Sequence, residues 1–419
     1  MFSENLFMFL FPAKGKNMYL CDTKNSSYIM EAFAFNSVEV ILLSATLLVL
    51  IIQSFYYFGL YNRIHARNKA LKSGELHFTQ ELPPLSVIIC AKNESENLRK
   101  FLPAVLEQDY PQYEVIVIND GSTDESEDLL SALEEKYDHL YHSFTPENSR
   151  YISRKKLALT LGIKASKHEW LVFTEANCKP VSNQWLRLMA RNFTPRTDVV
   201  LGYYGYEYAK GWFNRLVAFD ALFHSLRYLG WALAGSPYMG IGRNMAYRKS
   251  LFFEQKGFSA HLNLQRGDDD LFINQVAKGF NTKVETALDA TVRLEPVEWR
   301  KDWIEEKISY IATSNYYKGS QQVVNGLETM SRLLFHALFL GTTILAILSF
   351  HWLVAGLAFL LWMIREVMQA VIINRTAKEQ GEGWKYYLTL PLFDFLLPLQ
   401  NFKVRLYRLY RGKSDFMRR

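Results

Sequence analysis

The chain has 419 residues, of which 49% are hydrophobic and 21% charged, and its formal net charge is +6. This composition supplies enough apolar surface for a packed core, which excludes a largely disordered chain, and the modest charge excludes a nucleic-acid binder defined by charge alone. The three cysteines, Cys21, Cys90 and Cys178, are widely spaced without a CxxC pair. A disulfide scaffold and a structural zinc site are therefore unsupported, and a reducing compartment fits best.

The first long apolar segment covers residues 38–60 and carries one acid near its start. About 20 such residues suffice to cross a bilayer as a helix, so the segment predicts a transmembrane anchor. Basic residues crowd the linker 61–84, whereas residues 30–37 hold none, so the positive-inside rule predicts a cytoplasmic linker. Residues 1–37 form an N-terminal extension of unassigned structure. Its alternatives are a poor signal sequence and an extension ahead of a natural start at Met30.

Residues 85–320 alternate short β-rich runs with helical patterns, which is typical of a mostly parallel sheet covered by helices. Strands are predicted over 85–90, 114–118 and 170–173. Ser95 is the expected N-cap of the first helix, and Ser122 with Glu125 has the spacing of a capping box for the second. The predicted fold class is α/β, with the ligand site beyond the carboxyl ends of the strands.

Three polar clusters follow these strands, at residues 90–94, 119–122 and 174–177. Each cluster alone reads as ordinary turn residues. Because all three end a hydrophobic strand, they are expected to converge on one edge of the sheet and form a nucleotide-shaped site. The sequence contains no GxxxxGK[ST], HExxH or GxSxG motif, so P-loop, zinc-hydrolase and serine-hydrolase chemistry lose their main support.

Two further apolar stretches lie within residues 333–373, separated by almost nothing, and predict a membrane hairpin that returns the chain to the cytoplasm. Arg365 and Glu366 interrupt the second stretch, and they are expected to face helix partners or the inner interface. Residues 384–419 contain Pro391, Asp394 and Pro398 followed by a basic tail. This part is predicted to be interfacial or re-entrant.

Several segments, in order, resemble family 2 glycosyltransferases, which have the GT-A fold. The runs at 83–111 and 113–126 resemble the nucleotide-binding half of that family. Lys155 with Ala158, Leu159 and Gly162 resembles the GKxxALNxG segment, TEANCKP at 174–180 stands where the family has its DADCxP metal motif, and GIGRNMAYRK at 240–249 resembles the acceptor-side loop. GDDDLF at 267–272 resembles the catalytic-base motif. The resemblance covers residues 85–317 and implies a GT-A Rossmann-like nucleotide-diphospho-sugar transferase domain with added transmembrane helices.

The resemblance also implies roles for individual residues. Asp120 would contact the nucleotide base, and Lys155 would lie near the diphosphate. Asp269 would be the general base, although an N-cap role for it is open as well, since a helical pattern follows. The remaining implied residues are, on the donor side, Ala91, Asn93, Glu94 and Glu175, on the acceptor side, Gly240, Gly242, Arg243, Asn244 and Asp270, and, beside the base, Asp268. A tight turn remains the alternative for the two glycines.

The metal motif departs from the family pattern, because Glu175 and Asn177 stand in place of paired aspartates. A divalent cation, Mn²⁺ or Mg²⁺, is still the expected cofactor, with weaker affinity. The (Q/R)xxRW motif of processive synthases is also absent, and residues 299–317 offer only Lys307 and aromatics there. Trp299, Trp303 and Tyr310 suit either an interfacial helix or plain packing.

Together these features predict an inverting, membrane-bound glycosyltransferase that moves one sugar from a nucleotide-diphospho-sugar, UDP-linked by expectation, to a membrane-presented, lipid-linked acceptor in cell-envelope glycan or glycolipid synthesis. The expected location is the bacterial inner membrane with the catalytic domain cytoplasmic. The alternatives are a processive polysaccharide synthase, a catalytically degraded nucleotide-sugar-binding subunit and a membrane scaffold. The donor, the acceptor and the lipid bilayer are the expected partners, without nucleic acid.

Overall fold

The computed structural model describes residues 35–146 and 153–410. Residues 1–34 of the N-terminal extension, with the start at Met30, and the end of the basic tail lie outside the described residues. The chain divides into two compact units. One contains residues up to Ile52 together with Leu333–Arg365, and the other contains Gln53–Arg332 with Glu366–Arg419.

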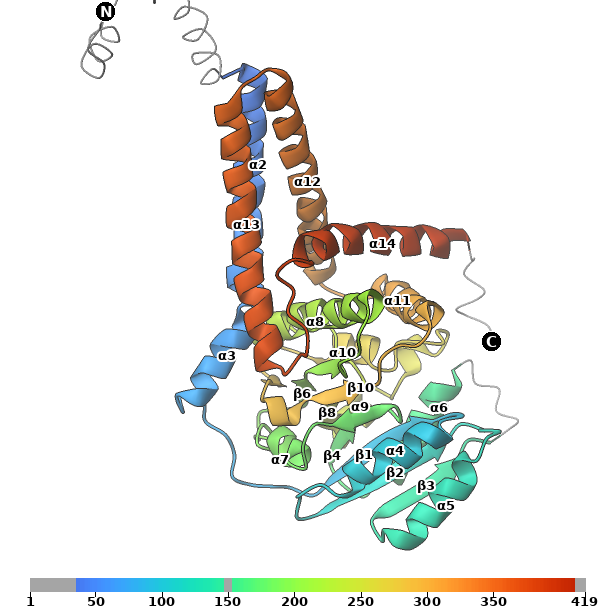
Figure 1. Ribbon diagram of the computed structural model, residues 1–419. Helices are drawn as coiled ribbons and strands as arrows, with labels where there is room; N and C mark the ends of the chain where they lie inside the picture. Colours follow the sequence, from blue (N-terminus) through green and yellow to red (C-terminus); the bar gives the residue numbers. More distant parts are fainter. Residues whose placement is uncertain (1–34, 147–152, 411–419) are drawn as a thin grey trace, which may run out of the picture. The chain divides into compact units, whose positions relative to one another are not determined.

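The first unit consists of long apolar helices (Figure 1). It holds most of α2 (Ser37–Tyr56), the later part of α12 (Gln321–Leu348) and the earlier part of α13 (Trp352–Glu379). His351, at the turn between α12 and α13, pairs with Glu39 at the start of α2, with 2.8 Å between Nδ1 and Oε2. Arg365 is fully buried, and its guanidinium lies 4.8 Å from the ring centre of Phe335. Arg365 therefore faces a helix partner, as predicted.

Three helical stretches of the described chain are long and apolar enough to cross a membrane. They cover Ser37–Lys72, Gln321–Leu348 and Trp352–Glu379, and they contain the predicted anchor and both predicted hairpin segments. The first stretch continues from α2 through the short π-helix η2 (Tyr57–Tyr61) into α3 (Arg63–Lys72). Membrane association is consistent with these helices.

The second unit is built on a seven-stranded mixed sheet in the order β3-β2-β1-β4-β8-β6-β9, with a three-stranded sheet in the order β5-β10-β7 beside it. In the large sheet, β1 to β4 are parallel, and β8 is antiparallel to both of its neighbours. The strands are β1 (Leu85–Ala91), β2 (Tyr113–Asn119), β3 (Leu140–Phe144), β4 (Trp170–Phe173), β5 (Cys178–Pro180), β6 (Val199–Gly202), β7 (Tyr204–Tyr206), β8 (Met245–Arg248), β9 (Thr282–Glu285) and β10 (Val292–Leu294).

Helices cover this sheet (Figure 1). They are α4 (Ser95–Leu106), α5 (Ser126–Lys136), α6 (Arg154–Ala165), α7 (Trp185–Ala190), α8 (Trp212–Leu233), α9 (Lys249–Glu254), α10 (Asp270–Val276), α11 (Arg300–Ser314) and α14 (Leu390–Tyr410), with 3₁₀ turns η3 (Ser259–His261) and η4 (Leu288–Ala290). The three strands predicted from the sequence are confirmed as β1, β2 and β4, each almost wholly buried, which explains their continuous apolar runs.

The predicted helix caps are wrong in detail. Ser95 is the first residue of α4, and its backbone N–H donates to Asp124 Oδ2 across 3.0 Å. Helix α5 begins at Ser126, whose N–H donates to Asp124 Oδ1 across 3.1 Å, so Ser122 and Glu125 form no capping box. Asp124 caps both helices because the loops after β1 and β2 lie side by side, and linear spacing does not reveal that pairing.

Candidate active site

One cavity opens where β1, β2 and β4 end, bounded by the loop before β8, the start of α10 and one face of α11. Its volume is about 490 Å³. The polar clusters that were predicted to converge line this cavity, and one face of α11 completes the lining. The lining residues include Cys90, Lys92, Glu94, Asp120, Lys155, Glu175, Asn177, Arg243, Arg266, Asp268, Asp269, Asp270, Asp302, Glu305, Glu306, Ser309, Tyr310 and Thr313. The expected convergence of three strand ends on one site is thus present in the structure.

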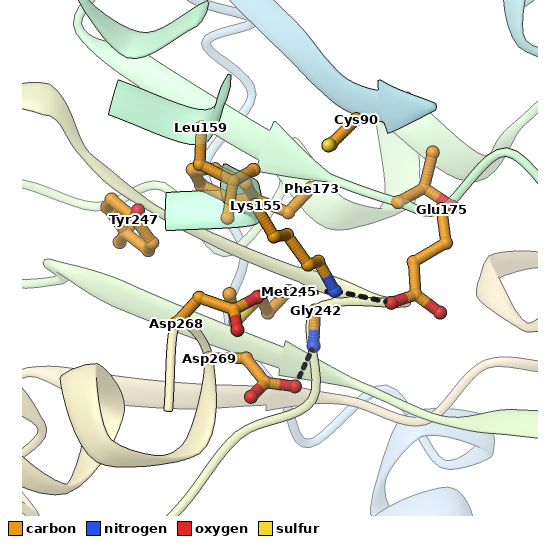
Figure 2. Close-up of a pocket in the computed structure, with 11 residues that line it drawn as sticks. Cys90, Lys155, Leu159, Phe173, Glu175, Gly242, Met245, Tyr247, Asp268 and Asp269 are labelled. Carbon is orange, nitrogen blue, oxygen red and sulfur yellow. Dashed lines mark hydrogen bonds and ion pairs between the residues drawn. The ribbon is translucent and has the colours of Figure 1, made fainter. Parts of the chain in front are cut away.

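A chain of alternating charges runs across the floor of this cavity. Lys155, on α6, donates from Nζ to Glu175 Oε1 across 2.8 Å, and Figure 2 shows the two side chains pointing at each other. Arg243 donates to the other oxygen of Glu175 across 2.9 Å. The same guanidinium reaches Glu306 of α11 across 2.8 Å. The chain of charges thus joins the strand-end loops to α11.

The charge chain fixes the protonation state of Glu175. Burial alone raises the pKa of this carboxyl, but the positive charges of Lys155 and Arg243 outweigh burial and hold its pKa well below the ordinary range. Lys155 also lies 3.2 Å from Asp268 Oδ2. Although burial opposes its charge, Asp268 and Glu175 raise the pKa of Lys155 well above its ordinary value. Both side chains therefore stay charged at neutral pH.

Asp269 is held by three hydrogen-bond donors. Its Oδ2 accepts from the backbone N–H of Gly242 across 3.0 Å (Figure 2) and from the Tyr310 hydroxyl across 3.3 Å. Its Oδ1 accepts from the N–H of Asp270 across 2.7 Å, so Asp269 is also the N-cap of α10. Burial, followed by the neighbouring charge of Asp268, raises the pKa of Asp269. The carboxylate is half-buried and lines the cavity, where a bound hydroxyl could reach it.

Asp270 points back toward α11. Its Oδ2 accepts from the Tyr317 hydroxyl across 2.7 Å and from the Thr313 hydroxyl, and its Oδ1 accepts from the N–H of Leu271 across 2.7 Å. Burial and the charge of Asp269 raise the pKa of Asp270 to about 7. Asp270 thus links α10 to α11 by hydrogen bonds, and it also lines the cavity.

Asp120 lies at the end of the cavity formed by the loops after β1 and β2. The side chain is buried, and its Oδ1 accepts from Thr145 Oγ1 and from Arg154 Nε, each across 2.8 Å. Asn93 has a positive φ of 55°, and its backbone N–H donates to Ser122 Oγ across 2.8 Å. The loops predicted to hold a base and a ribose therefore support each other, and Glu94 of the same loop lines the cavity.

Other predicted residues serve the fold. Asn244 is buried, donates to the carbonyl oxygens of Tyr203 and Ala290 across 2.8 and 2.9 Å, and accepts from Trp185 Nε1 across 3.0 Å. A Cβ on Gly240 would lie 2.9 Å from atoms of Ile273 and Leu201, so this glycine permits close packing. Ala91 is buried at the end of β1. Of the predicted acceptor loop, Arg243 lines this cavity, whereas Gly242 lines the smaller neighbouring pocket drawn in Figure 2.

The residues expected to bind a metal are oxygen donors of a suitable kind, but they are few. Glu175 and Asn177 both line the cavity, yet both oxygens of Glu175 are already paired with cationic side chains. Within residues 35–146 and 153–410, no group of three or more His, Cys, Asp or Glu could hold a metal ion. Protein ligands alone thus do not form a resident site, and the donor set fits a cation only when another molecule supplies further oxygens.

Sequence reasoning missed the contribution of α11. Tyr310, Thr313 and Tyr317 direct their hydroxyls at Asp269 and Asp270, and Glu306 holds Arg243. Trp303, which the sequence left open between a membrane interface and packing, is buried and donates to Asp220 across 3.0 Å. Tyr310 and Thr313 share one face of α11 and Tyr317 follows just after that helix ends, but no pattern within the segment says what these residues meet.

The family is decided by a match over the strand-rich half of the unit. Residues 86–254 match the model described as glycosyl transferase family 2. They form a family 2 glycosyltransferase domain. The family resemblance and the enzyme class predicted from the sequence are thereby confirmed.

Relatives agree with this family. Glycosyltransferase AglE of Haloferax volcanii is 37% identical over 111 residues, which are 26% of this chain and 34% of AglE. Probable glycosyltransferase YdaM of Bacillus subtilis is 27% identical over 255 residues, 58% of this chain and 57% of YdaM. A poly-beta-1,6-N-acetyl-D-glucosamine synthase of Staphylococcus epidermidis is 28% identical over 127 residues, 30% of this chain and 29% of the synthase. The chain covers less than two thirds of each relative.

A solved structure supports the fold. The mannosyltransferase PcManGT from Pyrobaculum calidifontis, in complex with GDP-Man and Mn²⁺, superposes with a TM-score of 0.51 at 16% identity. The superposition covers 87% of this chain and 99% of that one. The glycosyltransferase domain accordingly has the GT-A fold, as predicted.

Proposed function

We propose that the protein is an inverting glycosyltransferase that transfers a single sugar from a UDP-linked donor to a hydroxyl of a membrane-presented, lipid-linked acceptor. The observation that carries the proposal is the single cavity of about 490 Å³ that Asp120, Lys155, Glu175 and Asp269 line together. A nucleoside diphosphate held between Asp120 and Lys155 would bring its sugar toward Asp269.

The reaction proposed is one displacement at the anomeric carbon. Asp269 accepts the proton of the acceptor hydroxyl as the hydroxyl oxygen forms its bond to that carbon. The bond from the anomeric carbon to the diphosphate breaks, and the electron pair leaves with UDP. Because the oxygen enters opposite the leaving group, the configuration inverts. A positioned carboxylate base contributes about 10²- to 10⁴-fold to such a step.

Lys155 and Arg243 are proposed to face the leaving diphosphate. Both are positively charged and line the cavity, and their ion pairs with Glu175 and Glu306 hold them in fixed positions. Preorganised positive groups stabilise developing negative charge without reorganisation. We also propose that a divalent cation enters with the nucleotide, held by Glu175, Asn177 and the diphosphate. When bound, the cation would neutralise charge on the leaving group. The Mn²⁺ of PcManGT supports this proposal by similarity of fold.

The membrane-presented acceptor is proposed from the apolar surface of the chain. Besides the three candidate spans, α14 leaves five apolar side chains exposed on one side of the helix, namely Leu392, Leu399, Phe402, Leu406 and Leu409. Lys403 and Arg405 are exposed beside them. Such a helix suits the boundary between lipid and water. We further propose that the glycosyltransferase domain is cytoplasmic, at a bacterial inner membrane, because basic residues follow the first span.

Calorimetry of the full-length protein in detergent tests the proposal. Titration with UDP, GDP and ADP, with and without Mn²⁺, is expected to give binding strongest for UDP. Incubation with UDP-sugars and a total membrane lipid extract should then release UDP and label the lipid fraction. The similarity to poly-N-acetylglucosamine synthases favours one other candidate, a processive synthase, which would yield long polymers instead. Binding without turnover would indicate a degraded subunit, and no nucleotide binding would indicate a scaffold.

A further inference from the structure

Helix α11 lies against the proposed base, although residues 299–317 were expected to offer only Lys307 and aromatic side chains. Tyr310 and Thr313 lie about one turn apart on α11, and Tyr317 follows just after this helix ends at Ser314. Together these three residues meet the Asp269 and Asp270 pair at the start of α10. The hydroxyls are divided between the two carboxylates, with Tyr310 on Asp269, and Thr313 and Tyr317 on Asp270.

We infer that Tyr310 is a positioning residue for the proposed base Asp269. Gly242 and Asp270 donate to the carboxylate from the backbone, whereas Tyr310 donates from a side chain that also lines the cavity. The hydroxyl shares Oδ2 with the Gly242 N–H, and so restrains the direction in which that oxygen faces. This inference rests on the proposed function, because it takes Asp269 as the base.

The Tyr310 hydroxyl serves only as a donor in this contact. Burial and the charge of Asp269 raise the pKa of Tyr310 well above its ordinary value, so the phenol keeps its proton throughout the physiological range. A donor to a carboxylate stabilises the ionised form, which is the form that can accept a proton. Tyr310 thus acts in the same direction as Lys155 and the backbone N–H groups of Gly242 and Asp270, which lower the pKa of Asp269 against its burial and the Asp268 charge.

Two contacts hold α11 in place for this role. Lys307 pairs with Asp220 of α8 across 2.6 Å, and Trp303 donates to the same carboxylate across 3.0 Å. The Tyr310 ring also packs edge-on against His224, with ring centres 5.4 Å apart. Burial lowers the pKa of His224 to about 4, so the imidazole beside Tyr310 is neutral and adds no charge near the base.

The test compares Tyr310→Phe with the matched variant Tyr317→Phe, which removes a hydroxyl from Asp270 just past the end of α11. Initial rates of UDP release are measured from pH 5 to 9, and UDP affinity is measured in parallel. For Tyr310→Phe we expect kcat to fall roughly 3- to 30-fold and KM for the UDP-sugar to stay unchanged. The acidic limb of the pH–rate profile should move upward by about 0.5 to 1 pH unit. For Tyr317→Phe the limb should stay or move downward, because a neutral Asp270 repels Asp269 less.

Wild-type pH dependence in Tyr310→Phe, or equal shifts in both variants, would overturn the inference. Loss of UDP binding in Tyr310→Phe would also overturn it, because Tyr310 would then serve the fold. Asp269→Asn separates this inference from the proposed function. If Asp269→Asn keeps turnover, the assignment of the base fails. If Asp269→Asn is inactive while Tyr310→Phe behaves as wild type, only the positioning role fails.

Discussion

The backbone N–H of Gly242 donates to Oδ2 of Asp269 across 3.0 Å. Through this bond the loop before β8 and the start of α10, separated by more than twenty residues, meet at one carboxylate. Nearby, Lys155 reaches both Glu175 and Asp268. The donor-side and base-side parts of the cavity are therefore joined by hydrogen bonds and ion pairs before any substrate arrives.

Replacing Lys155 with Met is expected to weaken UDP binding by at least about tenfold, because the cavity loses one of the two positive charges proposed to face the diphosphate. Lys164→Met is the matched control, since Lys164 lies on the same helix and is exposed. Calorimetric titration of both variants measures the effect. Equal affinities in the two variants would remove Lys155 from the donor site.

Metal binding is expected to depend on the nucleotide. Because both oxygens of Glu175 are paired with cations, Mn²⁺ alone should give no calorimetric signal at micromolar concentration, whereas Mn²⁺ should tighten UDP binding. Glu175→Gln should reduce that tightening by about tenfold. Tight Mn²⁺ binding to the nucleotide-free protein would show that a resident site exists after all.

The stability of the fold should depend on Asp270. The folded-state pKa of Asp270 is about 7, above the unfolded value near 3.8, so the folded state holds an extra proton between these values. The stabilising effect of that proton is complete below about pH 4 and is lost as pH rises through 7. The melting temperature of Asp270→Asn relative to wild type should therefore rise by a few °C from pH 5 to pH 8. A constant difference across this range would contradict the assignment.

The proposed topology predicts labelling by a membrane-impermeant maleimide. In a chain whose three native cysteines are replaced by alanine, a cysteine at Ser349, between α12 and α13, should react in intact cells. A cysteine at Ser73, just after α3 and its basic residues, should react only after permeabilisation. The reverse pattern would place the glycosyltransferase domain on the other side of the membrane.

The strands and the convergence of their polar ends were predictable because buried parallel strands leave continuous apolar runs and end at a common edge. The caps of α4 and α5 were not, because Asp124 serves both across neighbouring loops. The role of α11 was also hidden. Tyr310 and Asp269 are 41 positions apart in sequence, and only the packing of α11 on α10 brings the hydroxyl to the carboxylate.

Asn244 and Gly240 are predicted site residues whose observed contacts lie inside the fold. Their position in an acceptor-like loop predicted contact with a sugar. In the structure the Asn244 side chain donates hydrogen bonds to Tyr203 and Ala290 and accepts one from Trp185, all inside the fold. Linear spacing cannot separate residues that shape a loop from residues that the loop presents. Burial and hydrogen-bond partners make that separation.

The role of Asp269 is tested most directly by comparing wild type with Asp269→Asn in two assays. One measures UDP release from a UDP-sugar in the presence of membrane lipid extract, and the other is a UDP titration. If Asp269 is the base, Asp269→Asn should lower turnover by about 10²- to 10⁴-fold and leave UDP affinity within about twofold of wild type. Turnover that survives the substitution, or UDP affinity that disappears with it, would contradict a cavity that holds the donor beside Asp269 as base.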